Sequence, residues 1–251
     1  MRTLIAFLLN VIFCHAAYAA ALFGTVEALS GDASVADIPG TTARVYKGQQ
    51  IFEGQTLNTS EGSEVHIATV DGGFIALREN TIFRVDEYKA EGDDSADKIF
   101  MSLLRGAMRS ITGWIGTHNR SAYRITTPNA TIGVRGTDHE TMVIVDGDGD
   151  EPGTYDTVNE GSTVLKTPQG ETVVKPGKFA FAPRNHAAPP HYLASHPRFW
   201  AMRRLRIEQR IQQRKMFLRS HRDQMRIDMR RKRLKHRQLN NIRGQTTIYQ
   251  E

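Results

Sequence analysis

The sequence predicts an all-β fold followed by a long basic α-helix, and three observations carry this prediction. Short apolar segments recur about every 8–12 residues from Leu22 to about Pro183, separated by Gly, Asn and Asp. Residues 198–243 lack Pro and Gly and are rich in Arg, Gln, Met and Leu, which favour helix. Residues 21–197 carry 15 Lys+Arg and 23 Asp+Glu (net −8), and residues 198–243 carry 17 and 3 (net +14). An acidic body with a basic tail is therefore expected.

Residues 1–20 resemble a cleavable export signal. Arg2 precedes an apolar run, Leu4–Phe13, and Ala17-Tyr18-Ala19 matches the small-x-small cleavage pattern, with a second candidate at Ala19–Ala21. The run of about 10 residues is too short to span a bilayer as a helix. We therefore expect a periplasmic or secreted protein with no transmembrane span in the mature chain.

Cys14 is the only cysteine and falls within this predicted signal. It admits a lipoprotein alternative, which the bulky Phe13 before it disfavours. Cleavage near Ala19 to Ala21 leaves a mature chain without cysteine, which excludes disulfides, thiol catalysis and cysteine-ligated metal sites.

The body, residues 21–183, shows the strands most clearly around its first sharp turn. Alternation through Val65–Thr69 predicts a strand, Asp71–Gly73 a turn, and Phe74–Leu77 and Ile82–Val85 the next two strands. Sandwiches, barrels and solenoids all show this rhythm.

Two charged segments interrupt the strands. Residues 90–98 are small and charged and predict a solvated loop, and residues 146–153 predict the tip of a long hairpin. Asp146, Asp148 and Asp150 also resemble the first half of a calcium loop. Glu151 and Thr157 stand where an EF-hand requires Gly and Glu, so a plain solvated tip is favoured and calcium stays an alternative.

Residues 184–197 predict an extended linker, because Pro189, Pro190 and Pro197 block regular structure. His186, His191 and His196 are five residues apart, a spacing that suits neither a helix face nor a strand face. We interpret them as polar linker histidines, with no metal and no cofactor expected.

The predicted helix, residues 198–243, is the strongest electrostatic feature. The candidate polyanion contacts are Arg203, Arg206, Arg210, Arg214, Arg222, Arg226, Arg230 and Arg233. The partner is an anionic envelope polymer or lipid surface, or the acidic body of the same or a neighbouring chain. Nucleic acid is disfavoured by the export signal, and a merely solvated charged helix remains an alternative. The oligomeric state stays open.

An ordered series of motifs runs through the body. It comprises Gly24-Thr-Val26, Gly31–Val35, Gly48–Thr59, Val65-His-Ile67, Asp71-Gly72, Leu104–Arg109, Thr126–Thr137, Gly161–Val164 and Lys175–Lys178. This series resembles the FecR family of periplasmic sensor domains. The resemblance implies a right-handed β-solenoid and a non-catalytic periplasmic binding or scaffolding module. Classical members also carry a cytoplasmic anti-sigma segment, and none precedes the apolar run in this sequence.

The family motif residues are Thr127, Pro128, Val134, Arg135, Gly136 and Thr137. Alternation predicts a buried Val134. Arg135, flanked by apolar residues, is expected to be partly buried and paired with a carboxylate or carbonyls. Gly136 permits a bend, and the Thr137 hydroxyl can bond to the local backbone. We favour a structural turn over a ligand contact.

No motif of catalysis is present: G-x-S-x-G, H-E-x-x-H and the P-loop are all absent. The leading hypothesis is a non-catalytic periplasmic protein whose FecR-like domain recognises a protein or cell-envelope partner, with the basic tail on an anionic surface. A FecR-like signal-transducing regulator is the alternative, and a cell-envelope hydrolase with two carboxylates is the second.

Overall fold

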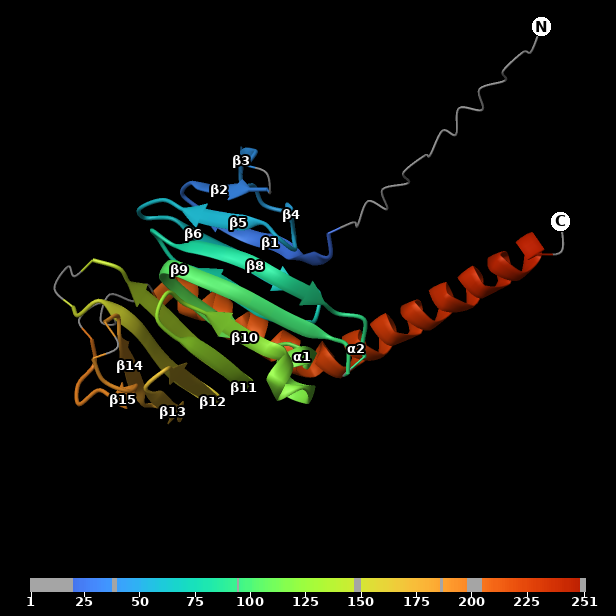
Figure 1. Cartoon of the computed structure of the whole chain (residues 1–251). Helices are drawn as coiled ribbons and strands as arrows, with labels where there is room; N and C mark the ends of the chain where they lie inside the picture. Colours follow the sequence, from blue (N-terminus) through green and yellow to red (C-terminus); the bar gives the residue numbers. More distant parts are fainter. Residues whose placement is uncertain are drawn as a thin grey trace, which may run out of the picture.

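The computed structural model describes residues 20–37, 40–93, 95–146, 150–185, 187–197 and 205–248. Its elements are β1 (Leu22–Ser30), β2 (Ala33–Ala36), β3 (Thr42–Arg44), β4 (Gln50–Phe52), β5 (Thr56–Thr59), β6 (Glu64–Thr69), β7 (Phe74–Leu77), β8 (Ile82–Lys89), β9 (Lys98–Ile111), α1 (Trp114–His118), η1 (Arg120–Ala122), β10 (Tyr123–Thr126), β11 (Thr131–Ile144), β12 (Gly153–Thr167), β13 (Gly170–Val174), β14 (Phe179–Pro183), β15 (His191–Tyr192) and α2 (Leu205–Ile248). The mostly-β architecture of the prediction is confirmed (Figure 1).

The long strand β9 is the point at which the sheet branches. Along one edge its first part pairs with β8 and its last part with β7. The β7 branch continues through β6 and β1 to β4, and the β8 branch through β5 and β2 to β3. Phe23 of β1 contacts the rings of Phe83 and Tyr88 of β8, with centroids 6.1 and 5.1 Å apart. The two branches therefore face each other across a shared apolar core, which gives this half a sandwich-like form.

Gly106 makes the branch point sterically feasible. Its φ is +81°, and a Cβ there would lie 2.4 Å from Thr81 Oγ1 and 2.7 Å from Asn80 O. The Thr81 hydroxyl bonds to both backbone groups of Ala107, at 3.0 and 3.1 Å. The turn between β7 and β8 is thus fastened directly onto β9 where only glycine fits.

The remaining strands form an open extension of the same sheet. β11 pairs with β9, β10 and β12, and β12 pairs with β13 and β14. The β11–β12 register runs from Thr131↔Lys166 to Ile144↔Gly153, which confirms the predicted long hairpin. Its tip includes Asp146 and Asp150, whereas Asp148 lies outside the described residues.

The β-solenoid implied by the family resemblance is wrong for this chain. Among the strand pairs of the described residues, only β9 and β10 run parallel. A solenoid needs parallel neighbours joined by long crossovers, and tight turns between sequential strands enforce antiparallel pairing instead. The turn at Asp71–Gly73 joins β6 to β7 in this way.

Two predicted irregular segments also differ from expectation. In the loop of residues 90–98, Asp97 is 2 % exposed and accepts the amide N–H groups of Glu91, Gly92 and Asp93 and the indole N–H of Trp114. The carboxylate thus organises a loop that was expected to be merely solvated. Within the linker, β15 pairs with β14, so this segment is not a free spacer.

The helix α2 crosses the sheet and then extends beyond it (Figure 1). Ile211 is fully buried in a cluster with Phe74, Ala76 and Ile111. Met225 and Met229 pack against the main core. Residues 198–204 of the predicted helix lie outside the described residues, and α2 continues past residue 243 to Ile248. No helix in the described part of the chain combines the length and apolar character needed to cross a bilayer.

Candidate functional site: an ion network joining helix and sheet

Charged side chains are buried where β9 and β11 lie side by side. Arg109 of β9 faces Glu140 of β11 in register, and Asp138 lies two residues before Glu140, on the same face of the strand. Arg109 donates from Nε to Asp138 Oδ1 at 2.8 Å and from Nη2 to Asp138 Oδ2 at 2.9 Å. This bidentate geometry is the strongest that a guanidinium and a carboxylate form.

The network continues on both sides of this pair. Glu140 lies 3.8 Å from Arg109 Nη1 and accepts a hydrogen bond from Arg78 Nη2 at 3.1 Å. Asn159 donates to Asp138 at 3.3 Å. Arg109, Asp138 and Glu140 are each at most 3 % exposed. Such burial requires that every charge has a partner.

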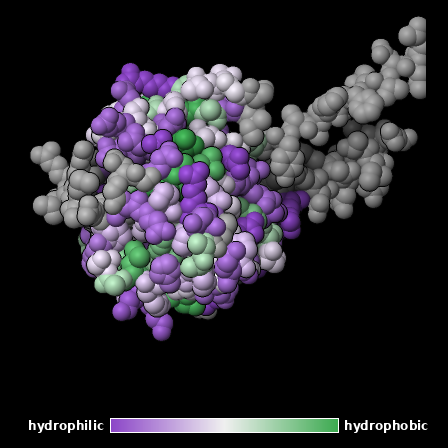
Figure 2. Space-filling view, turned by 60° about the vertical axis from the view of Figure 1, so that its left-hand side comes forward, coloured by the Kyte–Doolittle hydropathy of each residue, from purple (hydrophilic) through white to green (hydrophobic). Residues whose placement is uncertain are grey.

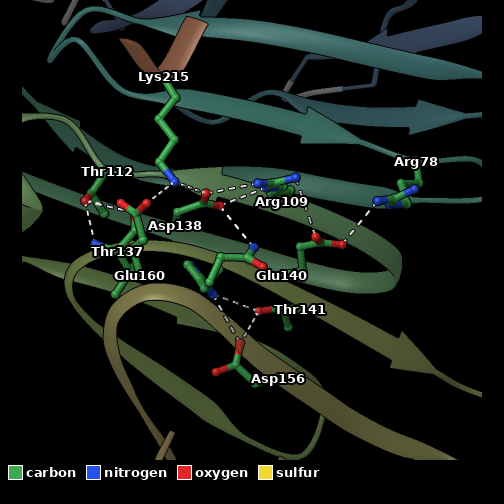
Figure 3. Close-up of polar contacts among 12 residues, drawn as sticks. Arg78, Arg109, Thr112, Thr137, Asp138, Glu140, Thr141, Asp156, Glu160 and Lys215 are labelled. Atoms are coloured by element: carbon green, nitrogen blue, oxygen red, sulfur yellow. Dashed lines mark hydrogen bonds and ion pairs between the residues drawn. The ribbon is translucent and has the colours of Figure 1, made fainter. Parts of the chain in front are cut away.

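Lys215 of α2 completes the network from outside the sheet (Figure 3). Its Nζ lies 2.7 Å from Asp138 Oδ2 and 2.7 Å from Glu160 Oε1 of β12. Lys215 is 6 % exposed, although it belongs to the basic tail. The helix therefore supplies one of the three cations that balance three carboxylates.

The pKa of Asp138 reflects these contacts. Burial alone raises the pKa of this carboxyl, but hydrogen bonds from Arg109 and then Lys215 outweigh it and lower the pKa to about 2. Asp138 is therefore an anion at every physiological pH, held between a strand arginine and a helix lysine.

A second polar cluster lies between β11 and β12. His139 Nδ1 is 3.1 Å from Asp156 Oδ1, and Thr141 donates to the same oxygen at 2.9 Å. Thr163 donates to the other carboxylate oxygen. His139 and Asp156 side chains are 0 % exposed. These contacts satisfy the Asp156 carboxylate and His139 Nδ1, whereas His139 Nε2 is buried with no hydrogen-bond partner among the described residues.

A second contact region fastens α2 farther along the helix. A Cβ on Gly92 would lie 2.8 Å from Arg226 O and 2.9 Å from Arg230 N, so the Asp97-organised loop touches the helix backbone. Arg233 donates to Asp93 at 2.7 Å and lies 3.5 Å from Glu91. A hydrogen bond from the Ser95 hydroxyl, and a smaller contribution from Arg233, hold the pKa of Asp93 below its usual value.

A groove of about 600 Å³ separates α2 from the sheet near its first contact. It is lined by Glu27, Ala28, Leu29, Lys47, His66, Phe74, Gln213 and Phe217. The His66 ring packs edge-on against Phe74 and pairs with Glu64. Its lining is mixed in charge and points to no single ligand.

The predicted family motif forms a structural turn. Thr127 Oγ1 donates to Ala130 O at 3.1 Å and is 2.7 Å from Thr154 Oγ1, while Pro128 is exposed between β10 and β11. Val134 is fully buried, as predicted. Gly136 has φ +62°, as its role in a bend requires.

Two details of this motif were wrong. Arg135 is exposed, because strand alternation places it on the face opposite the buried Val134, and Arg109 is the arginine that is buried against carboxylates at this sheet. Thr137 Oγ1 is buried with no hydrogen-bond partner among the described residues. The backbone of Thr137 pairs with Thr112 instead: its N–H donates to Thr112 Oγ1 at 2.8 Å.

The predicted polyanion contacts have different surroundings. Arg203 lies outside the described residues, and Arg206, Arg210, Arg214 and Arg222 lie on α2 with side chains that the structure does not describe. Arg226 and Arg233 are half-buried, and Arg230 is exposed. The structure therefore brings Arg233 to the acidic loop rather than leaving it to solvent.

The two linker histidines that the structure describes contact different aromatic rings. His191 contacts the ring of Phe181, and His196 that of Phe179, while His186 lies outside the described residues. Within the described ranges, no group of three or more His, Cys, Asp or Glu side chains is arranged to hold a metal ion.

Sequence reasoning missed Arg109, Asp138, Glu140 and Lys215. A weak signal was present for the first three, because they lie in strands close to apolar residues, where a buried charge must find a partner. Lys215 follows Ile211 by one helical turn, which places both on one face of the helix. Nothing in the sequence distinguishes this lysine from its basic neighbours.

Comparison with known proteins places the strand residues of this network, but not Lys215, within a recognised domain. Residues 55–163 match the family model described as FecR protein. Two crystal structures of a putative anti-sigma factor from Parabacteroides distasonis ATCC 8503 are similar at 13% and 14% identity, each with a TM-score of 0.42. Each match covers 55% of this chain and 59% of that chain.

A cell surface anchoring domain is 31% identical over 24% of this chain and 80% of its own length, with a TM-score of 0.24. No curated protein matches the sequence. The chain spans 59% of the length of the anti-sigma factor it matches, so the comparison concerns the domain and not a whole protein.

Proposed function

We propose that this chain is a non-catalytic regulatory binding protein of the cell envelope, because residues 55–163 match the FecR family model. Its β body binds a protein partner and passes on a signal, and α2 contacts an anionic surface. The predicted signal at residues 1–20 directs the chain to the periplasm. The family match supports the regulatory role more directly than a passive scaffold.

One observation favours binding over catalysis. The groups that could carry acid–base chemistry, Asp138, Glu140, His139 and Asp156, are all buried and bonded to neighbouring side chains. Protons and lone pairs engaged in this way stabilise a fold and are not offered to a substrate. A hydrolase with two carboxylates at a cleft finds no support among these residues.

The surface of the body suits a protein partner. Tyr46, Leu104, Val173 and Tyr192 are large apolar residues that are 63, 39, 40 and 46 % exposed. Figure 2 shows one face that is mainly hydrophilic with small separate hydrophobic areas. Interfaces of regulatory complexes combine a few such anchors with a polar surround.

Site-specific photocrosslinking in the native cell tests this function. A photoreactive residue is placed at each of the four positions in turn, and products are identified from the envelope fraction. We expect one defined protein to be captured from at least one position, and deletion of the chain to change the expression of a defined gene set. No capture from any position, together with unchanged expression, would contradict the proposal.

A further inference from the structure

The two halves of α2 differ in the charges available to them. Lys215 and Arg233 pair with carboxylates of the body. From residue 229 to residue 250 the sequence contains no Asp or Glu, while the cations are Arg230, Arg231, Lys232, Arg233, Lys235, Arg237 and Arg243. Figure 1 shows the same part of the helix leaving the body. Of these cations, Arg233 is half-buried, and the structure does not describe the side chain of Arg243. The exposed ones are Arg230, Arg231, Lys232, Lys235 and Arg237.

Three exposed apolar residues lie on one side of α2, two of them before these cations and one among them. Met216, Ile227 and Leu234 are 67, 44 and 49 % exposed. At about 100° per residue, they lie within about 20° of one another around the helix axis. Met225 and Met229, which pack on the core, lie about 180° and 220° away from this row. We call Met216, Ile227 and Leu234 the outer row.

We propose that the outer row and the cations around it bind the surface of an anionic lipid bilayer. This rests on the proposed function, in which α2 contacts an anionic surface, and it names that surface. Cations alone suit any polyanion, but exposed apolar side chains between them gain free energy only where an apolar phase is available. The bilayer boundary supplies both anionic headgroups and acyl chains.

The docking of α2 sets the orientation of the body. Ile211, Met225 and Met229 hold one side of the helix on the sheet, and the outer row faces away from it. A helix lying along the bilayer by its outer row therefore keeps the β body on the side away from the lipid. The partner-binding strands stay exposed to the aqueous compartment.

Vesicle sedimentation of the purified mature chain tests this proposal. The probes are vesicles of phosphatidylcholine with phosphatidylglycerol, vesicles of phosphatidylcholine alone, and soluble heparin, which offers charge without an apolar phase. We expect binding to the anionic vesicles and to heparin, weakened by salt, and little binding to phosphatidylcholine alone.

Two sets of variants separate the apolar and electrostatic contributions. The double variant Ile227→Gln, Leu234→Gln is expected to lose vesicle affinity about tenfold or more and to keep heparin affinity. Its matched control, Leu104→Thr with Val173→Thr, changes two exposed apolar residues of the proposed protein-partner surface and should bind vesicles and heparin as the parent chain does.

The triple variant Arg231→Gln, Lys235→Gln, Arg237→Gln is expected to lose about 100-fold in vesicle affinity and to bind heparin less well. Its control, Lys166→Gln, Lys175→Gln, Lys178→Gln, makes the same charge change on exposed residues of the body. Unchanged circular dichroism shows that each variant is folded.

The outcomes distinguish this inference from the proposed function. Heparin binding without vesicle binding, or vesicle binding unaffected by Ile227→Gln, Leu234→Gln, would overturn the lipid surface and leave a contact with a soluble polyanion. Binding to neither probe would remove the anionic-surface role of α2 altogether.

Discussion

Lys215 is the residue on which the union of helix and sheet depends most. Its ammonium group bridges the buried Asp138 and the partly exposed Glu160, and Lys215 itself is only 6 % exposed. Removing one partner of a buried pair costs far more than removing a surface pair, because the remaining charge stays buried without compensation.

Lys215→Met is therefore expected to lower the free energy of unfolding by about 3 kcal/mol. The control Lys166→Met removes an exposed pair with Glu171 and should cost less than about 1 kcal/mol. Urea unfolding of both variants measures the difference. Equal losses would mean that the Lys215 contacts add nothing beyond a surface ion pair.

Asp138 predicts how stability depends on acid. Its pKa is lowered from 3.8 to about 2 in the folded chain, so the unfolded state binds a proton more readily. The contribution, roughly 2 kcal/mol, is present above about pH 4 and is lost as pH falls through about 2. Asp138→Asn should flatten this part of the stability profile. A profile that keeps its acid slope in the variant would assign the effect to other carboxyls.

At the residue scale, sequence reasoning was right about Val134 and Gly136 and wrong about Arg135. The alternation of buried and exposed residues along a strand is a local property, so it could be predicted directly from the sequence. Which buried arginine meets which carboxylate depends on the neighbouring strand, and Arg109 and Asp138 are 29 residues apart.

At the scale of elements, Gly92 brings the loop of residues 90–98 against the backbone of α2. Gly92 and Gly48 both have positive φ, +75° and +90°, but a Cβ on Gly48 meets no atom within 4 Å. An alanine at either position adopts a strained backbone, at about 1 kcal/mol. Only Gly92→Ala also presses on the helix backbone.

Gly92→Ala is therefore expected to destabilise the chain by at least about 1 kcal/mol more than Gly48→Ala and to speed tryptic cleavage within α2. Thermal unfolding and timed proteolysis compare the two variants. Matching stability and cleavage rates would show that the loop does not hold the helix.

The elements themselves were largely predictable, but their pairing was not. Turn residues such as Asp71–Gly73 and the hairpin of β11 and β12 follow from local sequence. The branching at β9 depends on Gly106 fitting against Thr81, a contact that no periodicity reveals. The docking of α2 on the sheet could not be predicted from the sequence either, because the apolar residues of the helix are divided between the core and the outer row.

For the whole molecule, α2 functions as part of the domain and not as an appended tail. A chain that ends at Arg204 would expose Phe74, Ala76 and Ile111 and leave Asp138 and Glu160 without Lys215. We expect it to unfold at lower temperature and to aggregate more readily than the full chain. Scanning calorimetry and light scattering measure both. A truncated chain as stable as its parent would make α2 dispensable to the fold.

The export signal proposed from the sequence leads to a prediction at the same scale. Cleavage after Ala19 or Ala21 gives a mature chain that starts at Ala20 or Leu22 and contains no cysteine. Mass spectrometry of the protein from the periplasmic fraction identifies its first residue. A cell-derived chain that still begins at Met1 would contradict export.

The central claim is that a buried ion network anchors the basic helix to the body. Hydrogen exchange across α2 tests this claim most directly. Amides of residues 211–233 should be protected almost as strongly as those of β9 and β11, and amides of residues 234–248 should exchange faster. Lys215→Met should reduce the difference between the two segments. Rapid exchange along the whole of α2 in the unaltered chain would contradict the account.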